Sequence, residues 1–342
     1  MLSVVLPVLN EGDEIGRVLH EVYGQIEPPG GYEVLVVDGG SSDRTRRVVE
    51  ELAAEHSNLR LIENPRKLSS AGRNAGVRAA HGSYVLFLDG HCSIPGIDYF
   101  VRVVELFRTT GASCLCRPQH LIALADSNWA RAVAAARHSR LGHNYRSDIY
   151  GGPAGFTNPR SAGAAYKRDC FEQLGGYDER FDACEDVEFN HRVAEAGLSA
   201  FRHPDLRIDY RPRSGLRPLF HQMFRYGRGR ARLMALHPSL VPWPLLVMTG
   251  ILAVAAVAFA HGGAKLLVLL LGVPIGVWML VISAESFRLH RGSPAPAART
   301  ALAFVVIYAG LLAGFWRGSL EMRRFRESPS RAALSATVER SS

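Results

Sequence analysis

Three long apolar runs in the last third of the chain constrain its fold more than any other feature. Residues 240–260, 266–284 and 300–316 are uncharged and largely apolar over 21, 19 and 17 positions. An α-helix rises about 1.5 Å per residue, so the first two runs can cross a bilayer core of roughly 30 Å, and the third is at the lower limit. We therefore expect transmembrane helices over these three ranges.

Charge separates these runs from the rest of the chain. The 342 residues carry a formal net charge of +8, which by itself suggests a nucleic-acid partner. Residues 215–342 hold 15 Lys and Arg against 4 Asp and Glu, a net of +11, whereas residues 1–214 hold 25 against 28, a net of −3. The basic residues are thus interleaved with apolar runs. This pattern argues against nucleic-acid binding and indicates a mildly acidic domain attached to a basic membrane anchor.

The loops around the first two runs predict their orientation. Their connecting turn carries only Lys265, whereas the segment 285–299 carries Arg288, Arg291 and Arg299. The positive-inside rule then places the first domain and this segment in the cytoplasm, in a multi-pass protein of the inner or plasma membrane. A third crossing would place the basic tail, residues 319–342, outside, against the same rule. The alternative is a re-entrant or interfacial third run, and we expect the tail to be disordered.

The first 212 residues read as one α/β domain. Apolar, β-rich runs alternate with amphipathic stretches, which predicts βαβ units and a mainly parallel sheet. The expected strands are 3–8, 33–37, 59–62, 83–88 and 112–117, and the expected helices lie near 13–26, 43–56, 69–80, 97–109, 126–140 and 185–196. Residues 213–238 follow as a basic amphipathic helix that mixes Arg with aromatic residues, typical of a membrane interface. The N-terminus lacks a basic leader, and the five cysteines form no CxxC pair, which suggests reduced thiols in the cytosol.

Polar residues follow three of the predicted strands. In a parallel sheet, ligands bind beyond the carboxyl ends of the strands. Asn10 and Glu11 follow the first strand, Asp38 ends the second, and Asp89 and His91 follow the fourth. A strand-end Asp commonly binds a nucleotide, and an Asp with a His two residues later can hold a divalent cation that bridges a diphosphate. Helix capping, a tight turn and a solvated histidine are the alternative structural interpretations.

Two more motifs lie further along the chain. Glu185 and Asp186 open a predicted helix, where they cap the helix or, for Asp186, act as a general base. Gln222, Arg225 and Tyr226 lie in the basic helix. An Arg beside aromatic residues can bind a phosphate, or its side chain can extend to the lipid headgroups.

Taken in order, these motifs resemble the family 2 inverting glycosyltransferases of GT-A fold, the Rossmann-like fold of nucleotide-diphospho-sugar transferases. The resemblance covers roughly residues 1–230. Within the family, the chain is similar to the membrane-attached exopolysaccharide glycosyltransferases of the succinoglycan type. It rests on P-x-x-N-E, VVDGGSSDRT, AGRNAG, LFLDGH, GGYDERF, EDVE and R-Y-G-x-G-R.

The resemblance implies a role for each site residue. Asp38 would bind the uracil or ribose of the donor. Asp89 and His91 stand where the family has D-x-D and would hold Mg²⁺ or Mn²⁺. Asp186 falls on the catalytic base. The remaining positions are Pro7, Asn10, Glu11 and Arg73 on the donor side, and Glu185, Gln222, Arg225 and Tyr226 on the acceptor and diphosphate side.

The implied function is transfer of a sugar from a nucleotide sugar, expected to be a UDP-sugar, with inversion. The expected acceptor is a lipid-linked hydroxyl in bacterial exopolysaccharide or cell-envelope glycan synthesis. A sugar-nucleotide pyrophosphorylase would need a Gly-rich loop with a basic residue where this chain has PVLNE. A non-catalytic membrane scaffold that binds nucleotide sugar or lipid is the other alternative. The sequence indicates no oligomeric state.

Overall fold

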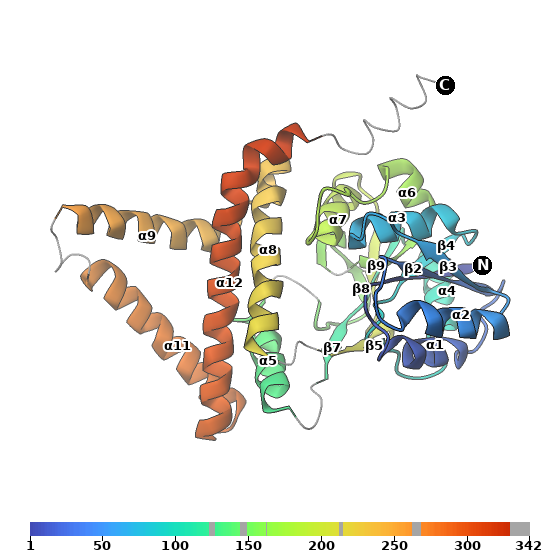
Figure 1. The fold of residues 1–342 in the computed structure, drawn as a ribbon, viewed down its shortest axis with the longest axis horizontal. Coiled ribbons are helices and arrows are strands. Elements are labelled where there is room, and N and C mark those ends of the chain that lie inside the picture. The colour runs from blue at the N-terminus through green and yellow to red at the C-terminus, as the bar shows by residue number, and fades with distance from the viewer. Residues whose placement is uncertain (123–126, 144–148, 162, 212–214, 262–267, 329–342) are drawn as a thin grey trace. The chain divides into compact units, whose positions relative to one another are not determined.

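The short apolar runs of the first 211 residues pair into one eight-stranded sheet (Figure 1). The computed structural model describes residues 1–122, 127–143, 149–161, 163–211, 215–261 and 268–328. These residues form two compact units, one within 1–121 and 146–211 and the other within 122–145 and 212–328. Each unit has its own hydrophobic core.

The sheet of the first unit has the strand order β3-β2-β1-β4-β9-β6-β10-β8, and β8 and β9 run antiparallel to the other strands. Its strands are β1 (Leu2–Val8), β2 (Tyr32–Asp38), β3 (Leu59–Glu63), β4 (Tyr84–Phe87), β6 (Cys114–Cys116), β8 (Gly155–Thr157), β9 (Gly163–Lys167) and β10 (Ala200–Arg202). A small second sheet has the order β5-β11-β7, with β5 (Cys92–Ser93), β11 (Ile208–Tyr210) and β7 (Gln119–Leu121).

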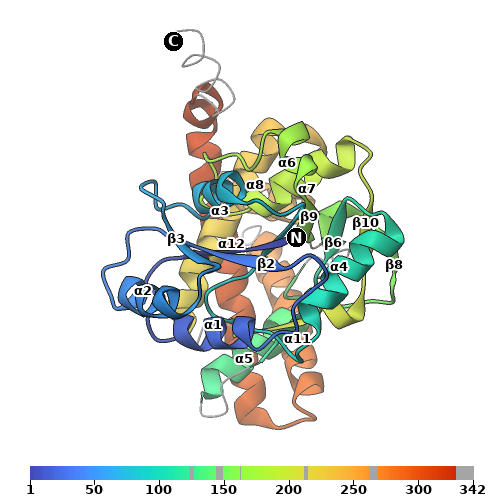
Figure 2. The ribbon, with the colours of Figure 1, turned by 90° about the vertical axis from the view of Figure 1, so that its right-hand side faces the viewer.

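Helices cover both faces of the large sheet (Figure 2). They are α1 (Ile15–Tyr23), α2 (Thr45–Glu55), α3 (Ser69–Ala79), α4 (Tyr99–Thr110), α6 (Asp169–Leu174) and α7 (Glu185–Glu195), with short 3₁₀ turns at Pro159–Ser161 and Pro204–Leu206. Successive side chains of a strand point to opposite faces, so Val4 and Leu6 pack with α1, α2 and α4, and Val5 packs on the side of α3, α6 and α7. The predicted α/β architecture with a mainly parallel sheet is therefore confirmed.

A buried carboxylate ties the first strands of the sheet together. Glu33, on β2, accepts hydrogen bonds from the Ser3 hydroxyl at 2.7 Å and the His81 amide at 2.6 Å, and it pairs with Arg60 at 2.8 Å. Burial alone would raise the pKa of Glu33, but the His81 amide, Ser3, Arg60 and the His81 ring outweigh burial and lower this pKa. The charged form of Glu33 is thus the form that stabilises the fold.

Glu33→Gln is therefore expected to destabilise the first unit most at neutral pH. A carboxyl with a lowered folded-state pKa stabilises the fold above its ordinary pKa of 4.5, and this contribution disappears as the pH falls through the folded-state value. The thermal midpoint of the variant, followed by circular dichroism in detergent, should converge on the wild-type midpoint in acid. A matched Glu63→Gln change, at a carboxylate that is 76% exposed, should leave the profile unchanged. A difference between the thermal midpoints of Glu33→Gln and wild type that stays constant with pH would contradict the stabilising role of the charged form of Glu33.

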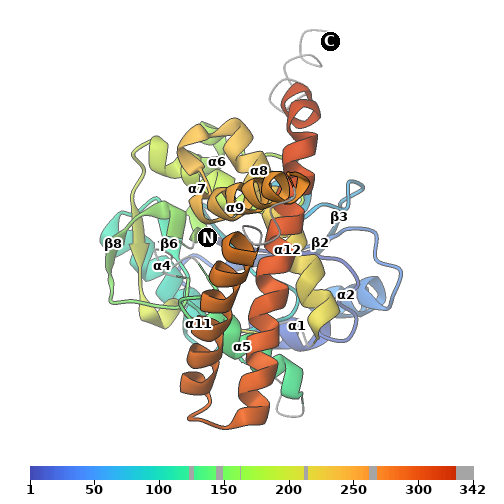
Figure 3. The ribbon, with the colours of Figure 1, turned by 90° about the vertical axis from the view of Figure 1, so that its left-hand side faces the viewer.

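The second unit is entirely helical (Figures 1 and 3) within the residues that the structure describes. It contains α5 (Asn128–His138), α8 (Leu216–Leu236), a 3₁₀ turn at Pro238–Leu240, α9 (Trp243–Ala260), a π-helical turn at Val268–Gly272, α11 (Val273–Leu289) and α12 (Pro294–Glu327). By length and composition alone, Leu270–Leu289 and Pro294–Glu327 could cross a membrane, and Trp243–Val257 is a shorter apolar helix.

Two predicted boundaries are wrong. The sequence predicts that the tail begins at residue 319, but α12 continues to Glu327, because Arg323 pairs with Glu327 at 3.1 Å and Arg326 donates to the Ala235 carbonyl at 3.0 Å. The sequence also predicts one domain over 1–212, but residues 122–145 belong to the second unit. There, Val133 of α5 joins the core that includes Phe304 of α12. Residues 329–342 of the expected tail lie outside the described residues.

Candidate active site

The carboxyl ends of the six parallel strands lie at one edge of the large sheet. The site is built on four of them, β1, β2, β4 and β6, and β6 runs parallel to β4 because antiparallel β9 lies between the two. Of the site residues predicted from the sequence, Asn10 and Glu11 follow β1, Asp38 ends β2, and Asp89 and His91 follow β4. Pro7 lies within β1, opposite Val37 of β2.

The loop after β1 is fastened to the loop after β2. The Asn10 amide donates to the Ser41 hydroxyl at 2.9 Å, and the Asn10 side-chain oxygen accepts from the Ser42 amide at 2.9 Å. The Glu11 amide donates to the Thr45 hydroxyl at 2.9 Å. Asn10 has a φ of 56°, a left-handed conformation that Asn tolerates better than most residues. Asn10 therefore shapes this edge of the site through its backbone as well as through its side chain.

Asp38 is the last residue of β2, and both oxygens of its carboxylate accept hydrogen bonds within the protein. The side chain is buried, and its oxygens accept from the Ser41 hydroxyl at 2.5 Å, the Ser41 amide at 3.1 Å and the Gly40 amide at 3.2 Å. Arg46 lies 3.4 Å away. The carboxylate thus holds the turn that follows β2. The predicted contact with a nucleotide would require Ser41 or Arg46 to release it.

Asp89 follows β4, and within the described residues no hydrogen bond reaches its carboxylate. The oxygens lie 3.8 Å from Arg73 and 4.0 Å from Arg117, and 31% of the side chain is exposed. Burial alone would raise the pKa of Asp89, but Arg117, Arg73 and His91 outweigh burial and lower this pKa. Asp89 is therefore ionised and available to a ligand.

His91 lies against Glu11 and an aromatic ring. Its Nδ1 is 3.0 Å from Oε1 of Glu11, and its ring packs edge-on against Tyr210, with the ring centroids 5.2 Å apart. A carboxylate that binds one ring nitrogen fixes the orientation of the other. Glu11, predicted on the donor side, and His91, predicted as a metal ligand, are thus brought together by a direct contact.

The residues present fit a divalent cation that is shared with a diphosphate. Mg²⁺ is commonly held by one or two protein carboxylates together with substrate phosphates. Asp89 meets this requirement because its carboxylate is ionised and partly exposed and accepts no hydrogen bond within the described residues, and His91 lies two residues away. Among the described residues, no group of three His, Cys, Asp or Glu is arranged to hold a metal. The protein alone therefore offers a partial coordination shell.

A buried ion pair joins α3 to the start of α7. Nη1 of Arg73 donates to Oε1 of Glu185 at 3.0 Å, with 15% and 9% of the two side chains exposed. The guanidinium also lies over the rings of Phe87 and Tyr177, 5.7 and 5.6 Å from their centroids. Burial raises the pKa of Glu185, Arg73 opposes this, and the net direction is upward. Arg73 thus connects Glu185 with Asp89.

Asp186 differs from its neighbour Glu185 in exposure. It is exposed at the first turn of α7, and one of its oxygens accepts from the Val187 amide at 2.8 Å. Within the described residues, its other oxygen has no hydrogen-bond partner. The preceding residue, Cys184, has a φ of 66°, a strained conformation for a residue other than Gly. This turn directs Glu185 into the protein and leaves Asp186 at the surface.

Three predicted residues belong to the second unit. Gln222, Arg225 and Tyr226 are on α8, in the second unit. The Gln222 side-chain nitrogen donates to the Tyr226 hydroxyl at 3.4 Å, one turn further along the helix. Their predicted role at the acceptor and diphosphate side stays a prediction.

Arg117, which follows β6, is a site residue that the sequence did not predict. Its Nη1 donates to the Phe87 carbonyl at the end of β4 at 2.7 Å, and only 8% of the side chain is exposed. Its buried Nε has no hydrogen-bond partner in the part of the chain that the structure describes. The sequence predicts a strand over 112–117, but it does not predict the position of β9 between β4 and β6. That insertion is what brings Arg117 to the same edge as Asp89.

Comparison with known proteins identifies the family. The profile of glycosyl transferase family 2 matches residues 3–175, which include β1 to β4 and the loops after them. The succinoglycan biosynthesis protein ExoA of Rhizobium meliloti is 33% identical over 326 residues, which cover 94% of this chain and 96% of that protein. The glycosyltransferase AglE of Haloferax volcanii is 27% identical and covers 69% of this chain and 74% of its own length.

A solved structure supports the fold. The mannosyltransferase PcManGT from Pyrobaculum calidifontis superposes with a TM-score of 0.58 at 20% identity, and the match covers 92% of this chain and 87% of that one. These findings confirm the predicted resemblance and the GT-A fold, and they favour an enzyme over a scaffold or a pyrophosphorylase. The chain therefore belongs to glycosyltransferase family 2 and is an enzyme that transfers a sugar from a nucleotide-sugar donor to an acceptor.

Proposed function

We propose that this enzyme transfers a sugar with inversion to a lipid-linked acceptor at the cytoplasmic face of the cell membrane, in exopolysaccharide or cell-envelope glycan synthesis. The observation that carries the proposal is the contrast between two adjacent carboxylates. Glu185 is buried against Arg73, whereas Asp186 is exposed at the helix start with one oxygen free. This arrangement supports Asp186 as the group that meets the acceptor.

Asp186 would act as the general base. A base must reach the hydroxyl proton, and Glu185 is excluded by its burial and by its ion pair. As the acceptor oxygen attacks the anomeric carbon, its proton passes to the free oxygen of Asp186. The bond to the nucleoside diphosphate breaks on the opposite face, so a single displacement inverts the configuration without a covalent enzyme intermediate.

The donor would bind at the sheet edge between Asp38 and Asp89. Arg73 and Arg117 lie beside Asp89 and favour an anionic diphosphate there. Asp89 and His91 would hold Mg²⁺ or Mn²⁺, which supplies charge neutralisation for the leaving diphosphate. The solved PcManGT structure is a complex with GDP-Man and Mn²⁺, which supports a cation here and leaves both UDP-sugars and GDP-sugars as candidate donors.

The acceptor is proposed from the second unit and from the relatives. The exposed apolar helices α9 and α11 would hold the enzyme at a bilayer, where a lipid-linked acceptor is available. ExoA is named for succinoglycan biosynthesis. A transferase of Methanococcus voltae, 23% identical over 237 residues, is named for a dolichyl-phosphate-linked acceptor. Both names support a membrane glycan pathway.

A donor screen tests the proposal. Membranes that contain the protein are incubated with labelled UDP-sugars and GDP-sugars and with Mg²⁺ or Mn²⁺, and the lipids are then extracted. We expect one donor to label the lipid fraction and EDTA to abolish the labelling. Membranes without the protein and membranes with Asp13→Asn, a change at an exposed carboxylate paired with Arg44, serve as controls.

Two results would contradict parts of the proposal. If label enters water-soluble acceptors as fast as it enters lipid, the proposal of a lipid-linked acceptor is wrong. If the rate of sugar transfer is unchanged after metal removal, the proposed role of the divalent cation is wrong.

A further inference from the structure

The third apolar run is packed backbone to backbone against a basic helix. Gly310, Gly314 and Gly318 recur every fourth residue along α12 and face α8. A Cβ atom on Gly314 would lie 1.9 Å from the Phe224 carbonyl oxygen, and one on Gly310 would lie 2.9 Å from that of Phe220. Only glycine permits this approach. The two helices therefore form one unit along most of α8, as Figure 1 also shows.

Further contacts fix the far end of this pair. Arg232 of α8 lies 3.8 Å from Glu321 and stacks 5.2 Å from the centroid of the Phe325 ring, both on α12. Arg326 donates to the Ala235 carbonyl at 3.0 Å. Wherever α12 lies relative to a bilayer, α8 must therefore lie beside it.

The composition of α8 indicates where the α8–α12 pair lies relative to a bilayer. Glycines at this spacing also join transmembrane helices, so the motif alone does not place α12 in lipid. However, α8 carries five arginines and no acidic residue: Arg217, Arg225, Arg228, Arg230 and Arg232. Each arginine at the bilayer centre is strongly unfavourable. Gly310, Gly314 and Gly318 of α12 lie beside Phe220, Phe224 and Arg228 of α8, so the apolar run 300–316 lies beside the part of α8 that carries Arg217 and Arg225. A crossing by α12 over this run would draw these two arginines into the hydrocarbon region.

The helices α9 and α11 have the opposite character. From Gly250 to Ala260, every residue with a described side chain is exposed except Leu252 and Ala255. From Gly272 to Val281, all residues except Trp278 are exposed. In the most apolar stretch of each helix, 11% is buried in α11 but 39% in α12. A helix that is apolar on all sides and exposed requires lipid around it. Figure 1 shows α9 and α11 extending away from the α8–α12 pair.

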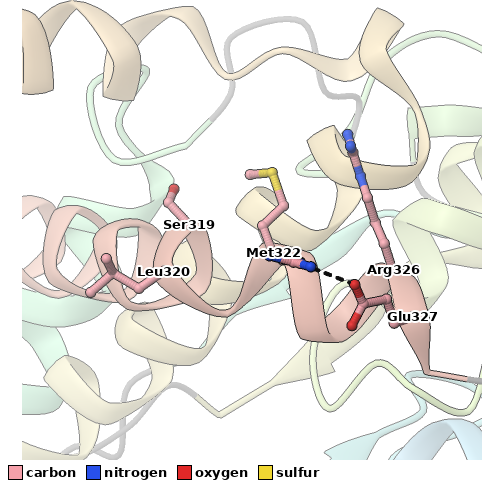
Figure 4. Close-up of a pocket in the computed structure, with 6 residues that line it drawn as sticks. Ser319, Leu320, Met322, Arg326 and Glu327 are labelled. Carbon is pink, nitrogen blue, oxygen red and sulfur yellow. Dashed lines mark hydrogen bonds and ion pairs between the residues drawn. The ribbon is translucent and has the colours of Figure 1, made fainter.

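The last turns of α12 have an interfacial composition. Leu320 is 82% exposed and Trp316 41% exposed, and on the same turns the exposed Arg317 and Arg323 pair with Glu321 and Glu327. Figure 4 shows Leu320 and Met322 on the same stretch of helix as Arg326, around a shallow hollow. Exposed apolar side chains beside arginines are complementary to anionic lipid headgroups and the adjoining acyl chains.

We infer that the membrane is crossed only by the α9–α11 hairpin, and that the α8–α12 pair lies in the interface of anionic phospholipid on the catalytic side. This deepens the proposed function, since it rests on membrane attachment. Of the three transmembrane segments expected from the sequence, 300–316 then does not cross. The turn at residues 290–293 and the tail that follows Glu327 stay in the cytoplasm, so every basic segment except Lys265 obeys the positive-inside rule.

Single cysteines at three positions test this topology. The variants are His261→Cys in the hairpin, Ser293→Cys before α12, and Ser335→Cys in the tail. A membrane-impermeant maleimide is applied to intact spheroplasts and to permeabilised ones. The five native cysteines are buried in the first unit, so the wild-type chain measures the background.

We expect His261→Cys to react in intact spheroplasts, and Ser293→Cys and Ser335→Cys to react only after permeabilisation. Labelling of Ser335→Cys from outside would show that α12 crosses and would overturn the inference. Labelling of Ser293→Cys from outside, or protection of His261→Cys, would overturn it as well. Sugar transfer is measured separately in each variant, so a failure of the topology is distinguishable from a failure of the proposed activity.

Discussion

Membranes with Asp186→Asn are expected to transfer sugar about 10²–10⁴-fold more slowly than wild-type membranes, because an amide cannot take the acceptor proton. The change keeps the size of the side chain and the hydrogen bond from the Val187 amide, which an amide oxygen also accepts. Nucleoside-diphosphate affinity should therefore stay unchanged. The measurement is the initial rate of lipid labelling with the donor found in the screen, together with equilibrium binding of that nucleoside diphosphate.

The matched control for this prediction is again Asp13→Asn, which should keep the wild-type rate because the Asp13 side chain is 92% exposed and bound only to Arg44 among the described residues. Glu185→Gln adds a second comparison at the neighbouring carboxylate. Wild-type turnover by Asp186→Asn together with a loss of turnover in a folded Glu185→Gln protein would assign the base to the buried residue. That result would overturn the role proposed for Asp186.

The parallel half of the sheet and the position of its site were predictable from local patterns. Residues 4–8 and 34–37 are apolar throughout, because both of their faces are buried, and a polar residue follows each run within two positions, at Asn10 and at Asp38. The carboxyl ends of neighbouring parallel strands must share an edge, so Asp38 and Asp89 could be placed together without a structure. What the pattern could not show is that the Asp38 carboxylate is hydrogen-bonded within its own turn, whereas the Asp89 carboxylate faces the guanidinium groups of Arg73 and Arg117.

The remaining features depend on contacts between segments far apart in the sequence. Arg117 reaches the site only because β9, about fifty residues later, inserts between β4 and β6. In α5, the alanine-rich sequence predicts a helix but not its partner in the second unit. The length of α12 was not predictable because its polar last turns are stabilised by packing on α8, which hydropathy does not measure.

The charges of the site form one connected group, and Arg73 is its centre. Glu185 and Asp89 lie on either side of the Arg73 guanidinium, and Arg117 lies on the far side of Asp89. Two arginines thus face two carboxylates, and of the four side chains only Asp89 is substantially exposed, at 31%. In such an arrangement each charge is stabilised mainly by its neighbours, so removing one leaves another buried without compensation.

Arg73→Met is therefore expected to destabilise the first unit by about 3–5 kcal/mol, the usual cost of breaking a buried ion pair by removing one partner. Methionine keeps much of the side-chain volume between Phe87 and Tyr177, so most of the loss comes from charge. The double variant Arg73→Met/Glu185→Gln should recover a large part of the stability. All five cysteines are buried in the first unit, so their reactivity with 4,4′-dithiodipyridine during urea unfolding reports on this unit alone.

The pH dependence of the free energy of unfolding tests the same prediction independently. Burial already raises the pKa of Glu185, and loss of Arg73, which lowers it, would raise it further. A carboxyl with a raised folded-state pKa stabilises the fold when protonated, and this contribution is lost as the pH rises through the folded-state value. The loss of unfolding free energy in Arg73→Met relative to wild type should therefore shrink from neutral to mildly acidic pH. The double variant should show a smaller trend, because of the two carboxylates only Asp89 then lacks its contact with Arg73. Equal destabilisation of the single and double variants at every pH would show that Arg73 acts through packing and not through its charge.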